Sequence, residues 1–95
     1  MNNDELYGRL GKRIREVRKA RRMTQACLAH RIRLSRASVV NIEKGRQMIS
    51  AWQLCQMGAA LGVPPHLWLL PEADFQEQKP LPSHWRRMET RYALT

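Results

Sequence analysis

One side of a predicted helix, from Arg36 to Lys44, carries a mixture of side chains that is unusual for a solvated surface. At 100° per residue, Val39 and Ile42 lie close together and mark the side that faces a core. The opposite arc carries Arg36, Ala37, Val40 and Asn41. Arginine can donate two hydrogen bonds to guanine, asparagine can pair with adenine, and alanine or valine can touch a thymine methyl group. The arc therefore predicts contacts with base edges in the major groove of DNA.

A second helix and a short turn are predicted directly before this arc. Thr24 is a good N-cap for a helix from Gln25 to about Ile32, and its inward residues are Leu28, Ala29 and Ile32. A turn at residues 33 and 34 follows, and Ser35 then caps the next helix. Gly45 ends that helix, because glycine readily takes the left-handed conformation that helix termini favour. Two helices joined by so short a turn predict a helix-turn-helix at about residues 24 to 45.

Three further helices supply the predicted core. The first begins after Asn3 or Asp4, either of which can cap it, and its apolar stripe is Leu6, Leu10, Ile14 and Val17. Ser50 caps a helix over residues 51–61 that Gly62 ends, with Leu54, Met57 and Leu61 on one face. Pro65 opens a short helix over residues 66–70. The fold class is therefore all-α, a compact bundle of five short helices.

The positive charge is confined to one half of the chain. All of the net charge of +9 lies in residues 1–46, whereas residues 47–95 are neutral overall. A basic surface attracts polyanions such as nucleic acid, although solubility alone would also account for it. The first helix contributes most of this charge through Arg9, Lys12, Arg13, Arg15, Lys19, Arg21 and Arg22. Its apolar stripe lacks tryptophan and phenylalanine, which favours packing against a core over binding to a membrane surface.

Catalysis, metal binding and membrane insertion have no support in the sequence. Cys27 and Cys55 form no CxxC pattern, and the three histidines lie far from any cluster of metal ligands. No catalytic triad or glycine-rich phosphate loop is present, and the spacing of Cys27 and His30 is common by chance. No run of 18 apolar residues occurs. We expect a cytoplasmic protein that is not an enzyme and has no cofactor or metal.

The C-terminal part of the chain is the least informative. Residues 1–70 are predicted to form the DNA-binding domain, and residues 71–95 a linker followed by a tail. The tail is predicted to be helical at its end, with Trp85, Met88 and Tyr92 at helical spacing. These residues, together with Leu67 and Trp68, are candidates for contact with a second subunit or another protein. Burial of Leu67 and Trp68 within the monomer is the alternative.

Taken in order, the residues of these helices resemble the helix-turn-helix regulators of the lambdoid phage repressor and Cro type, an XRE-like family. The resemblance covers residues 8–70, and its carriers include Arg18, Thr24, Gln25, Leu28, Ala29, Ser35, Val39, Ile42, Glu43, Gly45, Ser50, Leu54 and Leu61. It implies the same bundle of five helices. It also implies that Arg36, Ala37, Val40 and Asn41 read bases, and that Gln25, Lys44 and Arg46 bind phosphates. Arg18 and Glu43 match a largely buried salt bridge between the first and third helices.

Three positions depart from the family pattern. Arg33 stands where the turn commonly has glycine, so it takes a left-handed conformation or the turn differs. Cys27 replaces an acidic residue that would complete a capping box with Thr24. Gly58 replaces alanine within a helix, which is unfavourable unless close packing requires glycine.

The resemblance and the charge lead to one main functional expectation. The chain is expected to be a nucleoid-associated transcriptional regulator, a repressor that binds an inverted repeat of double-stranded DNA as a homodimer. Two alternatives share the DNA-binding fold. One is an antitoxin-type protein whose tail binds a partner protein, and the other is a restriction-modification controller.

Overall fold

The described part of the chain consists of helices and short turns. The structure is a computed structural model that describes residues 2–71 and residue 75. Its helices are α1 (Asn3–Ala20), α2 (Gln25–Ile32), α3 (Arg36–Glu43), α4 (Ala51–Leu61) and a 3-10 helix, η1 (Pro65–Leu69). No strand occurs within these residues. The all-α prediction is therefore confirmed.

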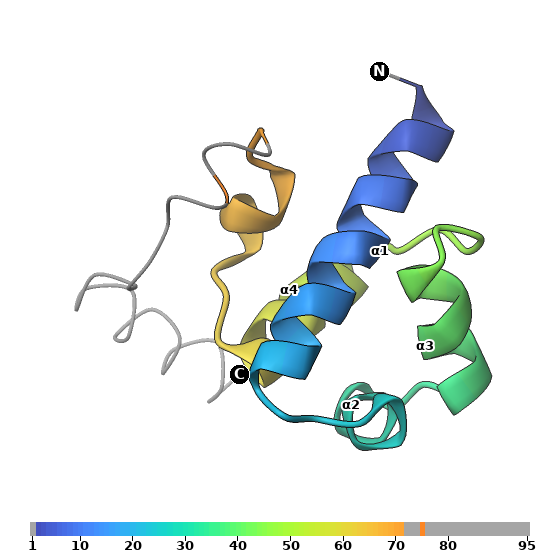
Figure 1. The fold of residues 1–95 in the computed structure, drawn as a ribbon, viewed down its shortest axis with the longest axis vertical. Helices are drawn as coiled ribbons and strands as arrows, with labels where there is room; N and C mark the ends of the chain where they lie inside the picture. Colours follow the sequence, from blue (N-terminus) through green and yellow to red (C-terminus); the bar gives the residue numbers. More distant parts are fainter. Residues whose placement is uncertain (1, 72–74, 76–95) are drawn as a thin grey trace.

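The long helix α1 lies at the centre of the arrangement. Helix α3 packs along one side of α1 and η1 along the other, while α4 lies behind it in the view of Figure 1. Helix α2 lies near the C-terminal end of α1 and packs against both α3 and α4. Helices α1 and α2 thus hold α3, and α4 packs against both of them.

The core contains the apolar side chains that the helical periodicities indicate. Leu10 and Ile14 of α1 are buried, and Leu6 and Val17 are partly buried at the edge of the same core. The other helices add to this core Leu28, Ala29, Ile32, Val39, Ile42, Leu54, Met57, Leu61, Leu67 and Trp68. Burying each large apolar side chain contributes about 1.5 to 3 kcal/mol, which makes this cluster the main source of the stability of the domain.

Side-chain caps begin the four α-helices. Thr24, Ser35 and Ser50 accept hydrogen bonds from the amides of Cys27, Ser38 and Gln53, so the three predicted caps are confirmed. The prediction for α1 was wrong, because the cap is Asn2, whose Oδ1 accepts from the Glu5 amide. Asn2 retains extended backbone geometry, whereas residues 3 and 4 are already helical. Asparagine and aspartate are both good caps, so residue type alone could not locate this end.

Left-handed residues end two of the helices and directly follow the ends of two others. Gly62 ends α4, and Gly45 follows the last turn of α3, both as expected. Arg33 takes φ 58° at the end of α2, so the turn keeps its usual shape without glycine. Arg22, just after α1, also has a positive φ of 57°, which the sequence did not indicate. The left-handed region costs a residue other than glycine about 1 to 2 kcal/mol, and here both costs fall on arginines that flank α2.

The fifth helix differs from the prediction in type and in bounds. It is a 3-10 helix over Pro65–Leu69, where the sequence predicted a helix over residues 66–70. The Leu67 amide donates to the Pro64 carbonyl three residues earlier, and a segment this short between prolines has no room to develop the α-helical pattern. Leu67 and Trp68 are buried inside the monomer, which was the alternative to their exposure at an interface. The exposed apolar residue of this segment is Leu69.

Two glycines allow another part of the backbone to approach a helix closely. A Cβ on Gly58 would collide with the carbonyl oxygen of Val63, so close packing explains why alanine does not stand there. A Cβ on Gly11 would collide with the carbonyl oxygens of Ile42 and Glu43 at the end of α3. The crossing of α1 and α3 therefore depends on a glycine that the sequence analysis did not single out.

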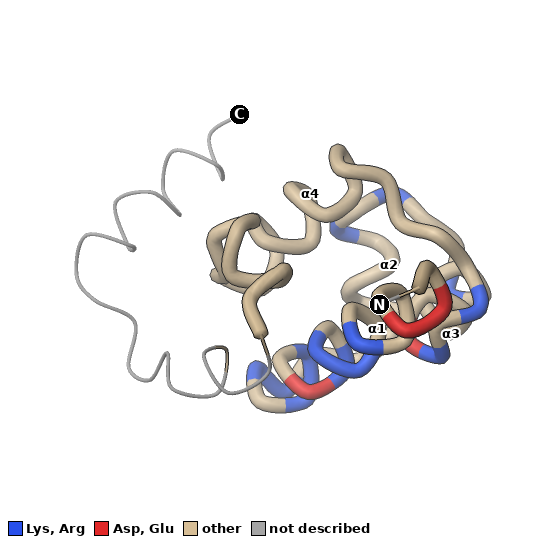
Figure 2. Tube along the Cα trace, turned by 90° about the horizontal axis from the view of Figure 1, so that it is seen from above, with Lys and Arg blue, Asp and Glu red and all other residues tan. Residues whose placement is uncertain are grey.

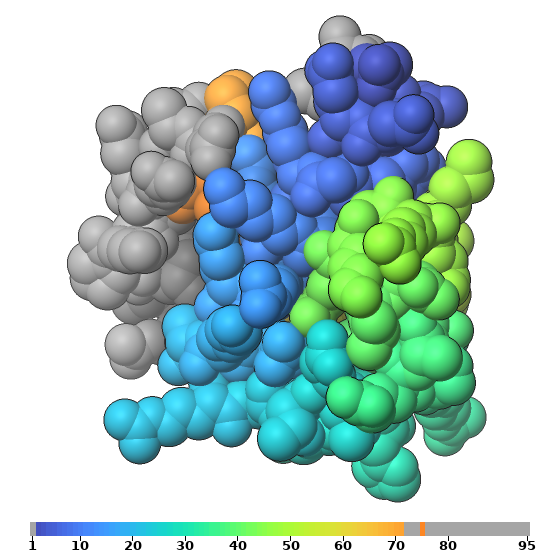
Figure 3. All heavy atoms as spheres, turned by 45° about the vertical axis from the view of Figure 1, so that its right-hand side comes forward, coloured from blue at the N-terminus to red at the C-terminus, as the bar shows by residue number. Residues whose placement is uncertain are grey.

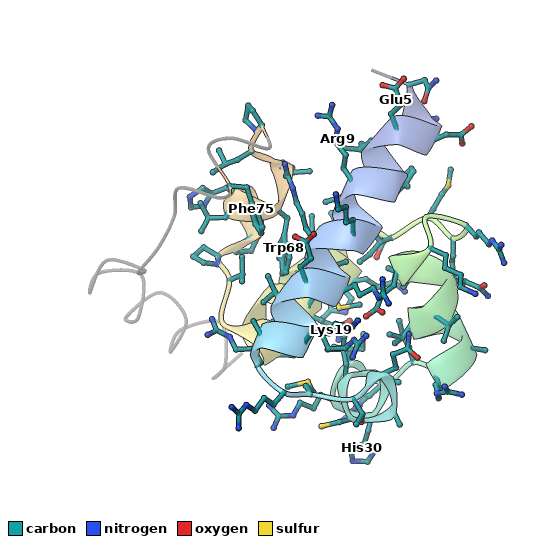
Figure 4. The ribbon with its side chains drawn as sticks, in the orientation of Figure 1. Glu5, Arg9, Lys19, His30, Trp68 and Phe75 are labelled. Carbon is teal, nitrogen blue, oxygen red and sulfur yellow. The ribbon has the colours of Figure 1, made fainter. Side chains whose placement is uncertain are left out.

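Arg13 is buried although the sequence placed it among the solvated basic residues of α1. Its Nη1 donates to the carbonyl oxygen of Trp68 over 2.6 Å, and its guanidinium lies 4.7 Å from the centre of the Phe75 ring. Phe75 comes from the segment that was expected to be a linker, and it stacks on Trp68 with ring centres 6.1 Å apart. Figure 4 shows Trp68 and Phe75 together beside α1. These contacts fasten the end of η1 to α1.

Candidate nucleic-acid interface

The turn between α2 and α3 fixes the angle between these two helices. The Leu34 amide donates to the Ala29 carbonyl oxygen and the Arg33 amide to that of His30, which closes the end of α2. Ser35 follows at once and caps α3 with its hydroxyl oxygen. Each residue of this turn belongs either to the end of α2 or to the cap of α3. The two helices therefore have little freedom to change their relative orientation. The two helices form neighbouring parts of one face, α2 in cyan and α3 in green (Figure 3).

Helix α3 presents to solvent the four residues that were predicted to read bases. Val39 and Ile42 are buried against the core, as the helical wheel required. On the other side, Arg36 and Ala37 are exposed and Val40 and Asn41 are half-buried. The side chains of this arc form no ion pair with another described residue. The exposed arc therefore offers one cation, one amide and two small apolar surfaces.

Two cations follow the arc at the C-terminal end of α3. Lys44 and Arg46 are both exposed, one at the last turn of the helix and one just after it. The Arg46 amide donates to the Asn41 carbonyl oxygen and the Gly45 amide to that of Ile42, which closes the helix end in a Schellman motif. The backbone of Gly45 also lies against Gly8 of α1. These contacts fix the backbone that carries the two cations.

A buried carboxylate at the end of α3 joins three helices. Glu43 accepts hydrogen bonds from Arg18 of α1, at 2.6 Å from Nε to Oε2 and 3.0 Å from Nη2 to Oε1. The side chains are only 9% and 2% exposed, so the salt bridge that the resemblance implied is present and buried. Arg18 also donates from Nη1 to the carbonyl oxygen of Met23, just before the cap of α2.

Gln25 stands at the first position of α2 and belongs to the same network. Its Nε2 donates to Oε1 of Glu43 over 3.1 Å, and the residue is half-buried. Thr24 accepts the hydrogen bond of the Cys27 amide, whereas the amides of Gln25 and Ala26 have no acceptor within the helix. Such amides, together with the positive end of the helix dipole, favour an anion at this end of α2.

The bond between Gln25 and Glu43 is the feature of the site that the sequence analysis missed. The two residues are 18 positions apart and lie on different helices, so no periodicity connects them. The family resemblance implied the pairing of Arg18 with Glu43, but it gave no sign that Gln25 binds the same carboxylate. The tertiary structure brings the predicted phosphate contact and the predicted structural salt bridge into one network.

The charge of the described surface is predominantly positive. Lys and Arg lie along α1 and at α3, whereas acidic residues are few (Figure 2). Glu43, the acidic residue at the end of α3, is paired with Arg18. Arg36 is the exposed cation of the arc itself, and the exposed cations next to the arc are Arg33, Lys44 and Arg46. A phosphate backbone laid against this side of the molecule would meet cations at both ends of α3.

Other classes of site find no counterpart in the described residues. Within residues 2–71 and 75, no group of three histidines, cysteines or carboxylates is arranged to hold a metal ion. No helix in the same part of the chain is both long and apolar enough to cross a membrane. Trp85, Met88 and Tyr92, which were candidates for contact with a partner, lie outside the described residues.

Comparison with known proteins agrees with the geometry. The family model of the helix-turn-helix domain matches residues 9–68. Among curated proteins, none matches the sequence. The chain is similar to the crystal structure of the restriction-modification controller protein C.AhdI from Aeromonas hydrophila, with a TM-score of 0.67 and 27% sequence identity, covering 74% of this chain and 100% of that one. Since the family model spans more than half of the sequence, this chain belongs to the helix-turn-helix domain family and is a DNA-binding regulator of the XRE-like type.

Proposed function

We propose that this protein is a sequence-specific repressor that binds an inverted repeat of double-stranded DNA as a homodimer. The observation that carries the proposal is the solvent-facing arc of α3, formed by Arg36, Ala37, Val40 and Asn41. Its one charged side chain, Arg36, forms no ion pair with another described residue. Polar and apolar side chains mixed on one exposed helix face suit the pattern of donors, acceptors and methyl groups in the major groove.

Each part of the interface has its own task in this proposal. Arg36 donates to guanine O6 and N7, Asn41 pairs with adenine, and the two apolar residues contact thymine methyl groups. Gln25, Lys44 and Arg46 bind phosphates on either side of the groove. Phosphate contacts carry no sequence information, but they fix the register in which α3 meets the bases.

A dimer follows from the small number of base contacts that one domain can make. Four side chains read only a few base pairs, and two-fold symmetry doubles both the contacts and the specificity. Two such domains on one face of the duplex would place their half-sites about 34 Å apart, one turn of the helix. A repressor of this kind acts by occupying a site that the transcription machinery needs.

Selection from a random pool of DNA duplexes, followed by sequencing, tests this function directly. We expect an inverted repeat to be enriched, and the enrichment to survive a rise in salt from about 50 to 200 mM, because base contacts add to the salt-sensitive phosphate contacts. Analytical ultracentrifugation of the complex with the selected duplex should give two chains per site. Affinity without an enriched motif would contradict the proposal, and one chain per site would contradict the dimer.

A restriction-modification controller is the second candidate. The similarity to C.AhdI, which extends over the full length of that chain, favours it. A controller differs mainly in activating as well as repressing transcription. A reporter gene downstream of the selected duplex, measured over a range of protein concentrations, separates the two. Repression alone supports the first proposal, whereas activation at low concentration and repression at high concentration would support a controller.

A further inference from the structure

The chemistry of Glu43 determines which atom of Gln25 faces it. A carboxylate only accepts hydrogen bonds, so the amide nitrogen of Gln25, rather than its carbonyl oxygen, lies 3.1 Å from Oε1 of Glu43. The nitrogen of a glutamine side chain carries two hydrogens, and Glu43 takes one of them. The second hydrogen remains available on a residue that is half-exposed at the first position of α2.

The carboxylate that holds Gln25 is itself held firmly. Two hydrogen bonds from Arg18 fix both oxygens of Glu43, and the side chain of Glu43 is only 2% exposed. A long glutamine side chain that is free in solution loses rotamer entropy when it is immobilised. Because Glu43 already holds Gln25 in the free protein, part of this entropy is lost on folding rather than on binding.

From these contacts we propose that Glu43 is a positioning residue, which aims the second N–H of Gln25 at one phosphate of the DNA backbone. The inference rests on the proposed function and deepens it. Glu43 ends the helix that reads bases, and Gln25 begins the helix that precedes it. The network therefore links the register of α3 in the groove to a specific phosphate at the start of α2.

Replacing single phosphates of the selected duplex with uncharged methylphosphonates tests the contact of Gln25. For the wild-type protein we expect one position in each half-site at which the replacement weakens binding roughly tenfold. A loss of this size corresponds to the removal of one hydrogen bond to a charged group. The variant Gln25→Met should lose this sensitivity at that position and keep it elsewhere. Gln56→Met, at the middle of α4, is the matched control and should behave as the wild type does.

A double variant tests the part played by Glu43. Arg18→Met with Glu43→Leu leaves no buried charge without its partner, and such replacements commonly preserve the fold. We expect this variant to lose most of the sensitivity at the phosphate of Gln25, while the positions that depend on Lys44 keep theirs. An equal loss at all phosphates, or no change at the phosphate of Gln25, would show that Glu43 has a structural role alone.

A measurement on the wild-type protein keeps the proposal testable even if the double variant does not fold. In NMR spectra of the free protein, one side-chain amide proton of Gln25 should exchange slowly with water, and those of Gln56 quickly. When the selected duplex is added, the second proton of Gln25 should shift downfield while the first keeps its position. Fast exchange of both protons, or loss of the bond to Glu43 in the complex, would overturn the inference.

The two levels of proposal can fail separately. If the wild-type protein selects no duplex, the proposed function is wrong and this inference falls with it. If a duplex is selected but Gln25→Met binds every methylphosphonate duplex as the wild type does, the inference alone is wrong.

Discussion

The guanidinium of Arg18 and the carboxylate of Glu43 meet through two hydrogen bonds inside the domain, at 2.6 and 3.0 Å. The pair connects the long helix α1 to the end of α3, and Gln25 connects α2 to the same carboxylate. The orientation of α3 therefore depends on one buried charge pair as well as on apolar packing.

Removal of one partner of this pair should be far more harmful than removal of both. Arg18→Met strands a buried carboxylate, and we expect it to lower the free energy of unfolding by about 3 to 5 kcal/mol. Urea denaturation followed by circular dichroism measures the change. The double variant Arg18→Met/Glu43→Leu should recover most of the loss, since no charge is left unpaired. A double variant as unstable as the single one would show that the buried charge is not the cause.

Glycines whose Cβ positions are blocked by backbone carbonyl groups should respond oppositely to a glycine with open space at that position. Gly11→Ala and Gly58→Ala place a Cβ against backbone carbonyl groups, which should lower stability by about 1 to 3 kcal/mol. Gly8→Ala is the matched control, because nothing lies near its Cβ position and alanine favours the helix by up to about 1 kcal/mol. The unfolding temperatures of the three variants, compared with that of the wild type, measure these effects. Equal effects at all three positions would contradict the close approach of the backbone to Gly11 and Gly58.

Replacing Arg33, the left-handed residue at the end of α2, with glycine should raise the free energy of unfolding. Arg33→Gly relieves a conformation that costs about 1 to 2 kcal/mol, and the greater flexibility of glycine in the unfolded chain offsets part of this. We expect a net gain of roughly 0.5 to 1 kcal/mol in urea denaturation. Arg31→Gly removes an arginine from the helical part of α2 and should instead lose about 1 kcal/mol. If both variants lose stability, Arg33 stabilises the turn by some other interaction.

Residues of the arc and residues beside it should differ in their effect on specificity. Asn41→Ala should cost about 1 to 3 kcal/mol on the selected duplex and relax the preference at one base pair. Lys44→Ala should weaken binding to all sequences alike and lower the slope of log K against log salt by about 1. Fluorescence anisotropy at several salt concentrations measures both quantities. A uniform loss for Asn41→Ala would place this residue among the phosphate contacts.

Much of the fold was predictable because it depends on local signals. The caps at Thr24, Ser35 and Ser50 lie next to the helices that they begin, and the apolar periodicities identified the buried face of each helix. The turn after α2 was predictable in position, and the family pattern raised the question of whether Arg33 takes a left-handed conformation. The four residues of the arc followed from the helical wheel, because the burial of Val39 and Ile42 determines which side of α3 remains exposed.

The sequence by itself thus determined the order of the helices, the bounds of α2, α3 and α4 to within a residue, the side of α3 that faces solvent and the family to which the chain belongs. Only the tertiary structure decided that Arg13 is buried and donates to the Trp68 carbonyl oxygen, that Gly11 lies against the end of α3, and that Gln25 is bound to Glu43. These contacts join residues far apart in the chain, and their energy comes from packing between helices. Periodicity and capping report only what lies within a few residues, so they carry no information about such contacts.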